Sequence, residues 1–343
     1  MAAIPETQNT IENLIYKAWA DDAAPPRPHM GASMLGHPCD RYLWLKFRWV
    51  MKERHSGRML ILFDRGHREE ERVVSHLRRI GAHVEKTGAN QARVSFGAHV
   101  SGSIDGIVSA LPIAPKAKAV LEIKTHSDKS FTELKRDGVQ KSKPMHWVQM
   151  CVYGYGESLD RALYVAVNKN TDEIYTEWLH LDKEVAEKAI ARGKRIALSD
   201  RMPEPVMGGC ESWYQCKVCD MHKFCWLTNC TDQVTCRNCA HSTAKDDNTW
   251  HCERHNADDI PVEFQRTGCD SHVLHPDLVP WKIHTDLSTE WEAVWMIDGI
   301  PVRNGEPDAT VFGSREILAN PAACANPDDF VKSAREKLGG RIA

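Results

Sequence analysis

Cysteine is distributed unevenly along this chain, because nine of the twelve cysteines fall between Cys210 and Cys269. The chain has no apolar run approaching the roughly 20 residues that cross a bilayer, and its first segment carries acids where a secretory signal carries bases. We therefore expect a cytoplasmic protein without membrane association. Thiols stay reduced in that compartment, so the clustering predicts metal ligation and not disulfides.

The length and the order of predicted elements indicate an α/β fold with a second, smaller domain. A prior of about 150 residues per domain gives two domains for 343 residues. β-branched runs, a helix, a hairpin and a charged helix follow one another, which favours a core with a mixed central sheet flanked by helices. No phosphate-binding GxxxxGK[ST] loop is present in the sequence, so no ATP-driven motor is expected. The predicted domains are a helix with a Pro-rich connector (1–30), the α/β domain (31–230) and a Cys/His-rich domain with a tail (231–343).

The formal net charge of −3 hides two basic stretches. Arg41 to Arg79 holds eleven Lys or Arg against five Asp or Glu, and Lys124 to Lys143 holds six against three. A surface that follows phosphates can be local even when the total charge is balanced. Ordinary solvated helix faces explain either stretch equally well.

The run VLEIKTH places two opposite charges inside an apolar strand. Side chains alternate along a strand, so Glu122 and Lys124 share one face. Such a pair is costly to bury unless another group uses it. Upstream, Asp105 lies between Gly102 and Gly106, which leave room around its carboxylate. Two carboxylates and an ammonium that converge can bind a hard divalent cation and orient a water molecule.

The ordered set of Asp105, the EIK triplet of Glu122 and Lys124, and then Gln149 and Tyr153 resembles the PD-(D/E)XK nuclease superfamily. It is similar to its RecB-like branch, which includes the CRISPR-associated RecB-like exonucleases. The resemblance implies a restriction-endonuclease-like core that hydrolyses phosphodiester bonds. It implies that Asp105 and Glu122 hold Mg²⁺ or Mn²⁺ while Lys124 positions and helps to deprotonate the attacking water. Gln149 and Tyr153 lie one helical turn apart, on one face.

An acid or histidine on an earlier helix is a further expected part of this site. The family carries such a residue as a metal ligand or organiser within a pattern like the GHREE of this chain. Glu70 has the spacing of the apolar stripe of its helix, and His67 lies near that stripe. Glu70 is ranked ahead as a site residue and His67 is kept as a candidate metal ligand. Acids in a first helical turn are the alternative explanation.

A first set of cysteines surrounds the predicted catalytic domain in sequence. Iron–sulfur nucleases of the RecB-like branch have one cysteine before the nuclease core and a C-x2-C-x5-C trio after it. The resemblance therefore implies a four-iron four-sulfur cluster, with structural zinc as the alternative. Cys210 and Cys230 lie nearby and could substitute. The implied ligands are Cys39, Cys216, Cys219 and Cys225.

A second set of cysteines follows in the C-terminal part. One C-x2-C pair and two later thiols suit tetrahedral zinc, although the missing second pair admits His241 or His255 as a ligand. Free thiols in a reducing cell are the alternative. Structural zinc would hold together a domain too small to bury much core. The predicted ligands are Cys236, Cys239, Cys252 and Cys269.

These patterns lead to one main functional hypothesis and two rivals. We expect a metal-dependent DNA exonuclease that acts in recombination, repair or DNA end processing, in the nucleoid or in the cytoplasm of a host cell. The composition suits a phage or bacterial gene. DNA is the expected partner, and a protein of recombination or replication is a further candidate partner. The rivals are an endonuclease of the same superfamily and a DNA-binding adaptor that does not cleave.

Overall fold

The computed structural model describes residues 10–342, so residues 1–9 of the predicted N-terminal segment lie outside the described residues. The chain packs as two compact units. Unit 1 takes the chain up to Gly36 with Glu53–Phe96 and Val100–Gly193, and unit 2 takes His37–Lys52, Gly97–His99 and the chain from Lys194 on. The boundaries expected at residues 30 and 230 divide the chain by composition, and the compact units do not follow them.

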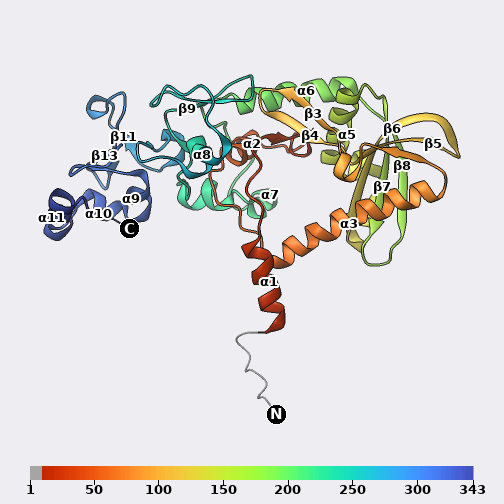
Figure 1. Ribbon diagram of the computed structural model, residues 1–343, viewed down its shortest axis with the longest axis horizontal. Helices are drawn as coiled ribbons and strands as arrows, with labels where there is room; N and C mark the ends of the chain where they lie inside the picture. The colour runs from red at the N-terminus through yellow and green to blue at the C-terminus, as the bar shows by residue number, and fades with distance from the viewer. Residues whose placement is uncertain (1–9, 343) are drawn as a thin grey trace, which may run out of the picture. The chain divides into compact units, whose positions relative to one another are not determined.

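Unit 1 is built on a five-stranded sheet with the order β2-β5-β6-β7-β8 (Figure 1). Only β6 and β7 run parallel, and the other neighbours are antiparallel. The predicted α/β core with a mixed sheet flanked by helices is therefore present. Its strands are β2 (His83–Glu85), β5 (Gly106–Leu111), β6 (Ala114–His126), β7 (Arg161–Asn168) and β8 (Ile174–His180). A second, three-stranded sheet holds β1 (Met30–Gly31), β4 (Val100–Ser103) and β3 (Arg93–Gly97).

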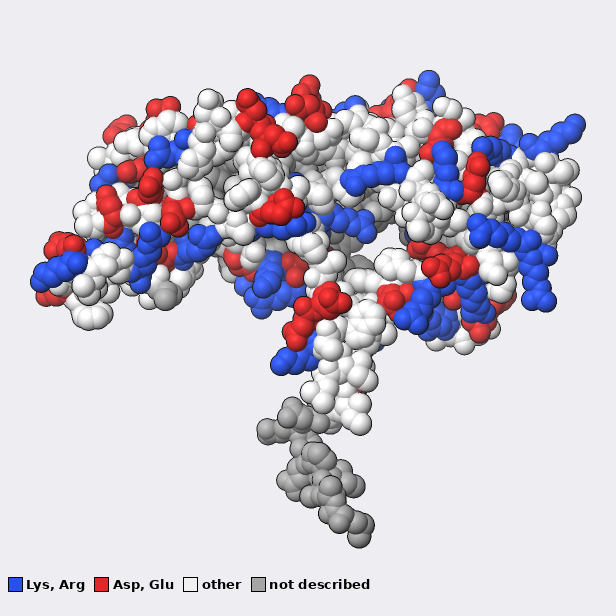
Figure 2. All heavy atoms as spheres, in the orientation of Figure 1, with Lys and Arg blue, Asp and Glu red and all other residues white. Residues whose placement is uncertain are grey.

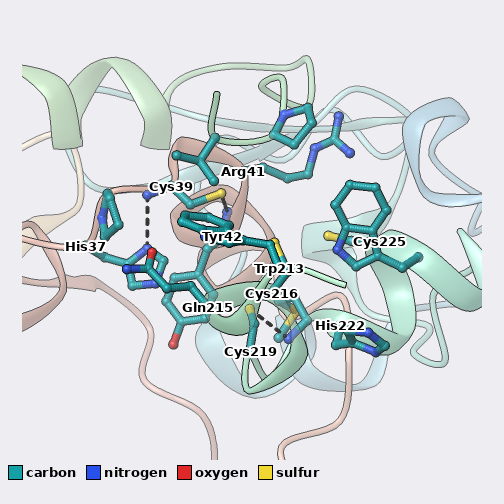
Figure 3. Close-up of a pocket in the computed structure, with 15 residues that line it drawn as sticks. His37, Cys39, Arg41, Tyr42, Trp213, Gln215, Cys216, Cys219, His222 and Cys225 are labelled. Carbon is teal, nitrogen blue, oxygen red and sulfur yellow. Dashed lines mark hydrogen bonds between the residues drawn. The ribbon is translucent and has the colours of Figure 1, made fainter. Parts of the chain in front are cut away.

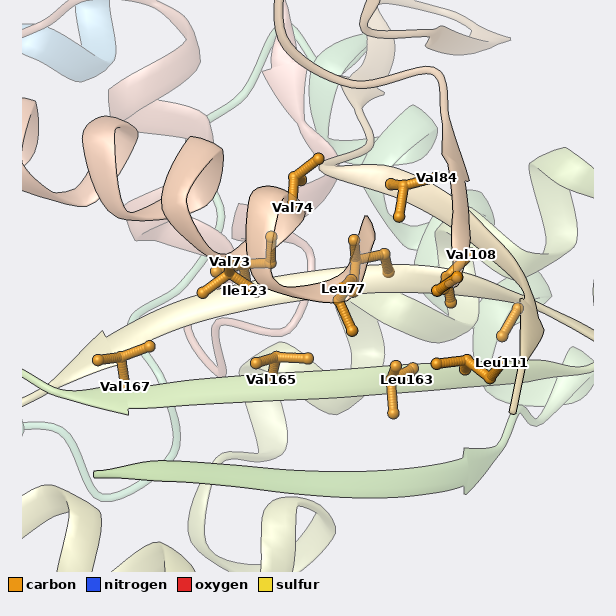
Figure 4. Packing of buried hydrophobic residues seen from close by; sticks show 13 residues of the cluster. Val73, Val74, Leu77, Val84, Val108, Leu111, Ile123, Leu163, Val165 and Val167 are labelled. Atoms are coloured by element: carbon orange, nitrogen blue, oxygen red, sulfur yellow. The ribbon is translucent and has the colours of Figure 1, made fainter. Parts of the chain in front are cut away.

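One face of the five-stranded sheet is covered by α3 (Gly57–Arg79). Its side chains at helical spacing, among them Val73 and Leu77, pack on alternate strand residues such as Leu121 and Ile123 of β6 (Figure 4). The helix begins at Gly57, nine residues before the GHREE segment, and Gly81 follows its end with φ +90°. Because odd residues of β6 face α3, its even residues face the other side.

The other helices of unit 1 follow the predicted order. Two of them, α4 and α5, pack against β6 and β7. A left-handed Gly138 (φ +70°) kinks α4 near its end. The helices are α1 (Ile11–Asp21), α4 (Asp128–Ser142), α5 (Pro144–Glu157) and α6 (Lys183–Ala197), which continues into unit 2, with 3-10 turns η1 (Ala32–Met34) and η2 (Gly88–Asn90).

Unit 2 contains short elements and two small sheets. Asp298 and Gly299, both with positive φ, form the turn of the hairpin β12–β13. The strands are β9 (Ser242–Ala244), β10 (Trp250–Cys252), β11 (Lys282–Ile283), β12 (Ala293–Ile297), β13 (Ile300–Asn304) and β14 (Val311–Phe312). The helices are α2 (Asp40–Phe47), α7 (Tyr214–Lys217), α8 (Val262–Thr267), α9 (Ser314–Ala319), α10 (Pro321–Ala325) and α11 (Asp329–Leu338), and the short helical turns are η3 (Lys223–Thr228), η4 (Cys236–Asn238), η5 (Pro276–Leu278) and η6 (Thr285–Leu287).

Buried arginines join α2 to the later chain within unit 2. Arg48 donates to the carbonyl oxygens of Arg237 (3.2 Å) and Ser199 (3.1 Å), and Arg237 donates to the carbonyl of Phe47 (2.9 Å). Both guanidinium groups lie over aromatic rings, including that of Trp250. These bonds span up to 190 residues of sequence. Across residues 10–342, no helix combines the length and the apolar character that a membrane span requires.

Candidate active site and cysteine clusters

The pairing of β5 with β6 brings Asp105 next to Glu122. Asp105 lies between β4 and β5, and its neighbour Gly106 pairs with Leu121. The Oδ2 atom of Asp105 accepts a hydrogen bond from the backbone N–H of Ile123 (2.9 Å). The strand register therefore fixes this carboxylate beside the residues of the EIK triplet.

The two carboxylates converge on the ammonium group of Lys124. Lys124 Nζ lies 3.6 Å from Asp105 Oδ2 and contacts Glu122 Oε1. Glu122 is fully buried, with 0% of its surface exposed, and among residues 10–342 its oxygens have no partner beyond this ion pair. Buried carboxylate oxygens are normally hydrogen-bonded, and a divalent cation is a suitable partner for oxygens that are not.

Burial disfavours the charged forms of the carboxyl groups in this site. Burial raises the pKa of Glu122 to about 8, an effect that Lys124 opposes and Asp105 strengthens. Burial also raises the pKa of Glu70 to about 7, and Asp105 adds to that rise. Burial lowers the pKa of Lys124, but Glu122 and Asp105 raise it by more, so it ends above its ordinary value. A cation bound beside these groups would favour their charged forms.

The long helix α3 brings Glu70, and not His67, to this group. Glu70 is half-buried, and its charge acts on Glu122 and is acted on by Asp105 and Lys124. His67 is exposed on the same helix, and no contact described within residues 10–342 joins it to the carboxylates. The neighbouring Glu69 is buried and pairs with Arg72. Of these two neighbouring acids, Glu70 interacts with the charged groups of the site and Glu69 interacts with Arg72.

The helix α5 carries Gln149 and Tyr153 on its buried side. Burial raises the pKa of the Tyr153 phenol, and the charges of Glu122 and Asp105 add to the rise. Gln149 hydrogen-bonds this phenol. Tyr153 therefore lies near the carboxylates, and Gln149 is joined to it by this hydrogen bond.

Gly102 on β4 leaves the space that the Tyr153 hydroxyl occupies. A Cβ at position 102 would lie 2.8 Å from Tyr153 Oη and 2.9 Å from Ala32 Cβ. We expect Gly102→Ala to lower the free energy of unfolding by about 1–3 kcal/mol, because the core must shift. Urea unfolding measures this. Gly66→Ala on α3 is the control, since no atom lies within 4 Å, and it should stabilise by about 0.5–1 kcal/mol. Equal stability of both variants would contradict the packing at Gly102.

The first set of cysteines lines one small cavity in unit 2. Cys39 is the N-cap of α2, where its Sγ accepts from the backbone N–H of Tyr42 (3.5 Å). Cys216, Cys219 and Cys225 reach the same cavity, of about 50 Å³, from the segment around α7 and η3 (Figure 3). Neither Cys210 nor Cys230 lines it. Burial raises the pKa of Cys225 to about 11, so this thiol is protonated without a metal.

The second set of cysteines lines a larger cavity of about 250 Å³, also in unit 2. Burial raises the pKa values of Cys236 and Cys239 to about 12 each. His255 Nε2 lies 3.6 Å from Cys269 Sγ. Cys252 lies at the end of β10 and completes the set. Both histidines that the sequence admitted, His241 and His255, also line this cavity.

The candidate metal ligands lie further apart than the ligands of a bound metal ion. Within residues 10–342, no three Cys, His, Asp or Glu side chains already stand close enough together to hold an ion. Their chemistry nevertheless fits, because four thiols in one cavity suit zinc or an iron–sulfur cluster, and clustered buried carboxylates suit Mg²⁺ or Mn²⁺. A metal would also replace the protons that burial keeps on the thiols.

The basic stretches are largely paired with acids. Arg68 contacts Asp64 (2.8 Å), and Lys135 contacts Glu173 (2.5 Å). Figure 2 shows Lys and Arg interspersed with Asp and Glu over the visible face. The view therefore shows no large surface of a single sign.

Three residues that were not singled out from the sequence lie beside the site. Tyr164 on β7 pairs in register with Glu122 on β6 and so shares its face. His126 lies two residues after Lys124, and His146 lies one turn before Gln149. The sequence held a signal for both histidines, because His126 alternates with Lys124 along the strand and His146 lies three residues before Gln149. Tyr164 could be placed only once the pairing of β6 with β7 was known.

Comparison with known proteins gives weak structural likenesses. No protein-family model matches the chain, and no curated protein matches it. The crystal structure of SSO0001 is similar with a TM-score of 0.38 and 16% identity, covering 64% of this chain and 98% of that one. The alkaline exonuclease LHK-Exo from Laribacter hongkongensis has a TM-score of 0.35 and 16% identity, covering 52% and 90%. Its complex with dAMP gives 0.36 and 14% over the same shares. Likenesses this low carry neither fold nor activity over to this chain.

Proposed function

We propose that this chain is a metal-dependent DNA exonuclease of the PD-(D/E)XK kind, with a RecB-like catalytic unit. The observation that carries the proposal is the convergence of Asp105 and Glu122 on Lys124, with the Glu122 oxygens otherwise without partners among the described residues. Glu70 adds a third carboxylate to the group. A protein that only binds DNA does not need buried carboxylates grouped around a lysine, because such a group is costly to bury.

Each residue of the site has a separate role in the proposed phosphodiester hydrolysis. Asp105 and Glu122 would hold Mg²⁺ or Mn²⁺, with Glu70 close by; the bound ion would activate water and neutralise charge on the scissile phosphate. Lys124 holds a positive charge beside the carboxylates, where it can orient the attacking water. Tyr153 and Gln149 close the site from α5. His67 stays a candidate ligand only if α3 rearranges.

The two cysteine sets complete the proposal as metal sites that stabilise unit 2. Cys39, Cys216, Cys219 and Cys225 would hold a four-iron four-sulfur cluster, with zinc as the alternative. Cys236, Cys239, Cys252 and Cys269 would hold zinc, with His255 at the edge of the set. The proposed setting is recombination, repair or DNA end processing in a bacterial or phage-infected cytoplasm.

Cleavage of matched DNA substrates tests the function. End-labelled single- and double-stranded linear DNA is incubated with the protein in Mg²⁺ or Mn²⁺, beside covalently closed circles of the same sequence. Loss of linear DNA with intact circles is expected. Nicking of circles would favour the endonuclease, and absence of any cleavage with retained binding would favour the adaptor.

Absorption spectroscopy distinguishes the metal in the first cysteine set. Anaerobically purified protein should be brown with a broad band near the violet if the cluster is iron–sulfur, and colourless if it is zinc. Cys216→Ser should lose the band, because it removes one of four thiolates. Cys210→Ser is the matched control, since Cys210 is exposed and outside the cavity. A band that survives Cys216→Ser would contradict the ligand set.

A further inference from the structure

A chain of hydrogen bonds runs along the face of the sheet that carries Glu122 and Lys124. Tyr164 Oη lies 2.9 Å from His126 Nε2 and 2.9 Å from His146 Nδ1. The chain continues from His126 Nδ1 to Ser130 Oγ over 3.0 Å. The ring of His146 also stacks on that of Tyr164, with centroids 5.9 Å apart. Three elements therefore fix the position of His146: β6, β7 and the start of α4.

Two proton orders fit these distances, because either ring nitrogen of each histidine can carry the proton. In one of them Ser130 donates to His126 Nδ1, His126 Nε2–H donates to Tyr164 Oη, and Tyr164 donates to His146 Nδ1. His146 then carries its own proton on Nε2. No hydrogen bond within residues 10–342 is described for that nitrogen, and His146 is half-buried, so in this order one N–H donor stays available.

The surroundings of the histidines keep their rings neutral. Burial lowers the pKa of His146 to about 3, with Lys124 and then His126 and Lys143 adding to the effect. Burial likewise lowers the pKa of His126 to about 4, with Lys143, Lys124 and Lys169 adding to it. Lys143 is paired with Glu133 (2.8 Å). A neutral imidazole still has one N–H, which can donate to a phosphate oxygen.

We propose that His146 is a substrate contact, whose Nε2–H donates to a backbone phosphate of the DNA strand next to the scissile one. Tyr164 and His126 are positioning residues that hold its ring and its tautomer. This inference rests on the proposed nuclease function, since it names a subsite of that same site. It assigns to His146 a role in holding the strand and not in the bond-breaking step.

Histidine NMR tests the proton order without any reaction. In the full-length protein labelled with ¹⁵N-histidine, His146 should be neutral at pH 7 with its proton on Nε2, and His146→Gln identifies its signals. Tyr164→Phe removes the donor to Nδ1, so His146 should then show a mixture of tautomers. A proton on Nδ1 of His146 in the unaltered protein, or a charged ring at pH 7, would overturn the proposal.

Binding and kinetics test the phosphate contact. Affinity for an end-labelled oligonucleotide is measured in Ca²⁺, used as a non-cleaving ion, and kcat and KM are measured in Mg²⁺. His146→Ala should weaken binding and raise KM by about 10-fold to 100-fold with a smaller change in kcat, as expected for loss of a hydrogen bond to a charged group. His146→Gln, whose amide can donate, should recover part of the affinity. His83→Ala on the exposed edge strand β2 is the control and should change neither quantity.

The outcomes separate this inference from the proposed function. If His146→Ala leaves both the Ca²⁺ affinity and KM unchanged, the phosphate contact is wrong although cleavage stands. If the unaltered protein binds the oligonucleotide in Ca²⁺ with the His146 dependence but cleaves nothing in Mg²⁺ or Mn²⁺, the subsite stands and the nuclease function is wrong. Should His146→Ala fail to fold, Tyr164→Phe takes its place: it should weaken the Ca²⁺ affinity because it frees the tautomer of His146, and unchanged affinity would overturn the contact.

Discussion

The Asp105→Asn protein is expected to cleave DNA on the order of 10²–10³-fold more slowly than the unaltered protein, the range lost when one preorganised charge-stabilising group is removed. The substitution keeps the shape of the side chain and its acceptor oxygen for the Ile123 N–H, so the strands should stay in place. What is lost is one negative charge of the pair that faces Lys124. The rate of release of end label in Mg²⁺ measures the effect.

Two further variants test whether the loss of cleavage is specific to the site. Glu122→Gln should cause a loss of the same order, because the buried carboxylate is removed without a change of volume. Glu184→Gln on α6 is the matched control, since that carboxylate is exposed and pairs only within its helix with Lys188. Circular dichroism of each variant excludes unfolding as the cause. Cleavage by Asp105→Asn at the rate of the unaltered protein would refute the site.

Cys239→Ser is expected to destabilise unit 2 by several kcal/mol, because structural zinc contributes up to about 10–16 kcal/mol to the folding of small domains. Cys239 is buried in the second cysteine cavity. The elements that contribute to this cavity are short, and β9 and β10 have three residues each. Such elements bury too little apolar surface to be stable alone, so a metal bound by four thiols from three segments would be their main link. Thermal unfolding and the zinc content of the purified protein measure both parts of the expectation.

The control is Cys324→Ser, at a buried cysteine in α10 that belongs to the apolar core of unit 2. It should lower stability modestly and leave the zinc content unchanged. A chelator should reproduce the effect of Cys239→Ser on the unaltered protein and have no further effect on the variant. Protein purified without zinc and indifferent to chelators would show that the thiols are free.

The sequence predicts those parts of the fold that depend on local periodicity. The period of two in VLEIKTH predicts that Glu122 and Lys124 share a face, and β6 has that alternation. The Asp298–Gly299 turn is likewise a local signal. The helix expected around GHREE extends further back, to Gly57. Ser56, whose side chain accepts from the backbone N–H of Met59, is the local start signal that the prediction did not use.

The rest of the site depends on contacts that join distant segments. The parallel pairing of β6 with β7 brings Tyr164 opposite Glu122, and no pattern in either strand gives that register. The division into units is another such feature. His37–Lys52 belongs with the chain from Lys194 on, although most of unit 1 lies between them in sequence. Only long-range hydrogen bonds such as that of Arg48 with Arg237 reveal it.

That interrupted segment has a consequence for synthesis on the ribosome. Trp44, Leu45 and Phe47 are covered within unit 2, and Arg48 meets its acceptor 189 residues later. During translation at about 5–20 residues per second, this apolar helix therefore emerges many seconds before its partners exist. Until then the apolar side chains of α2 are exposed to solvent, where they can bind a chaperone or aggregate. A chain that ends before unit 2 is complete would keep them exposed.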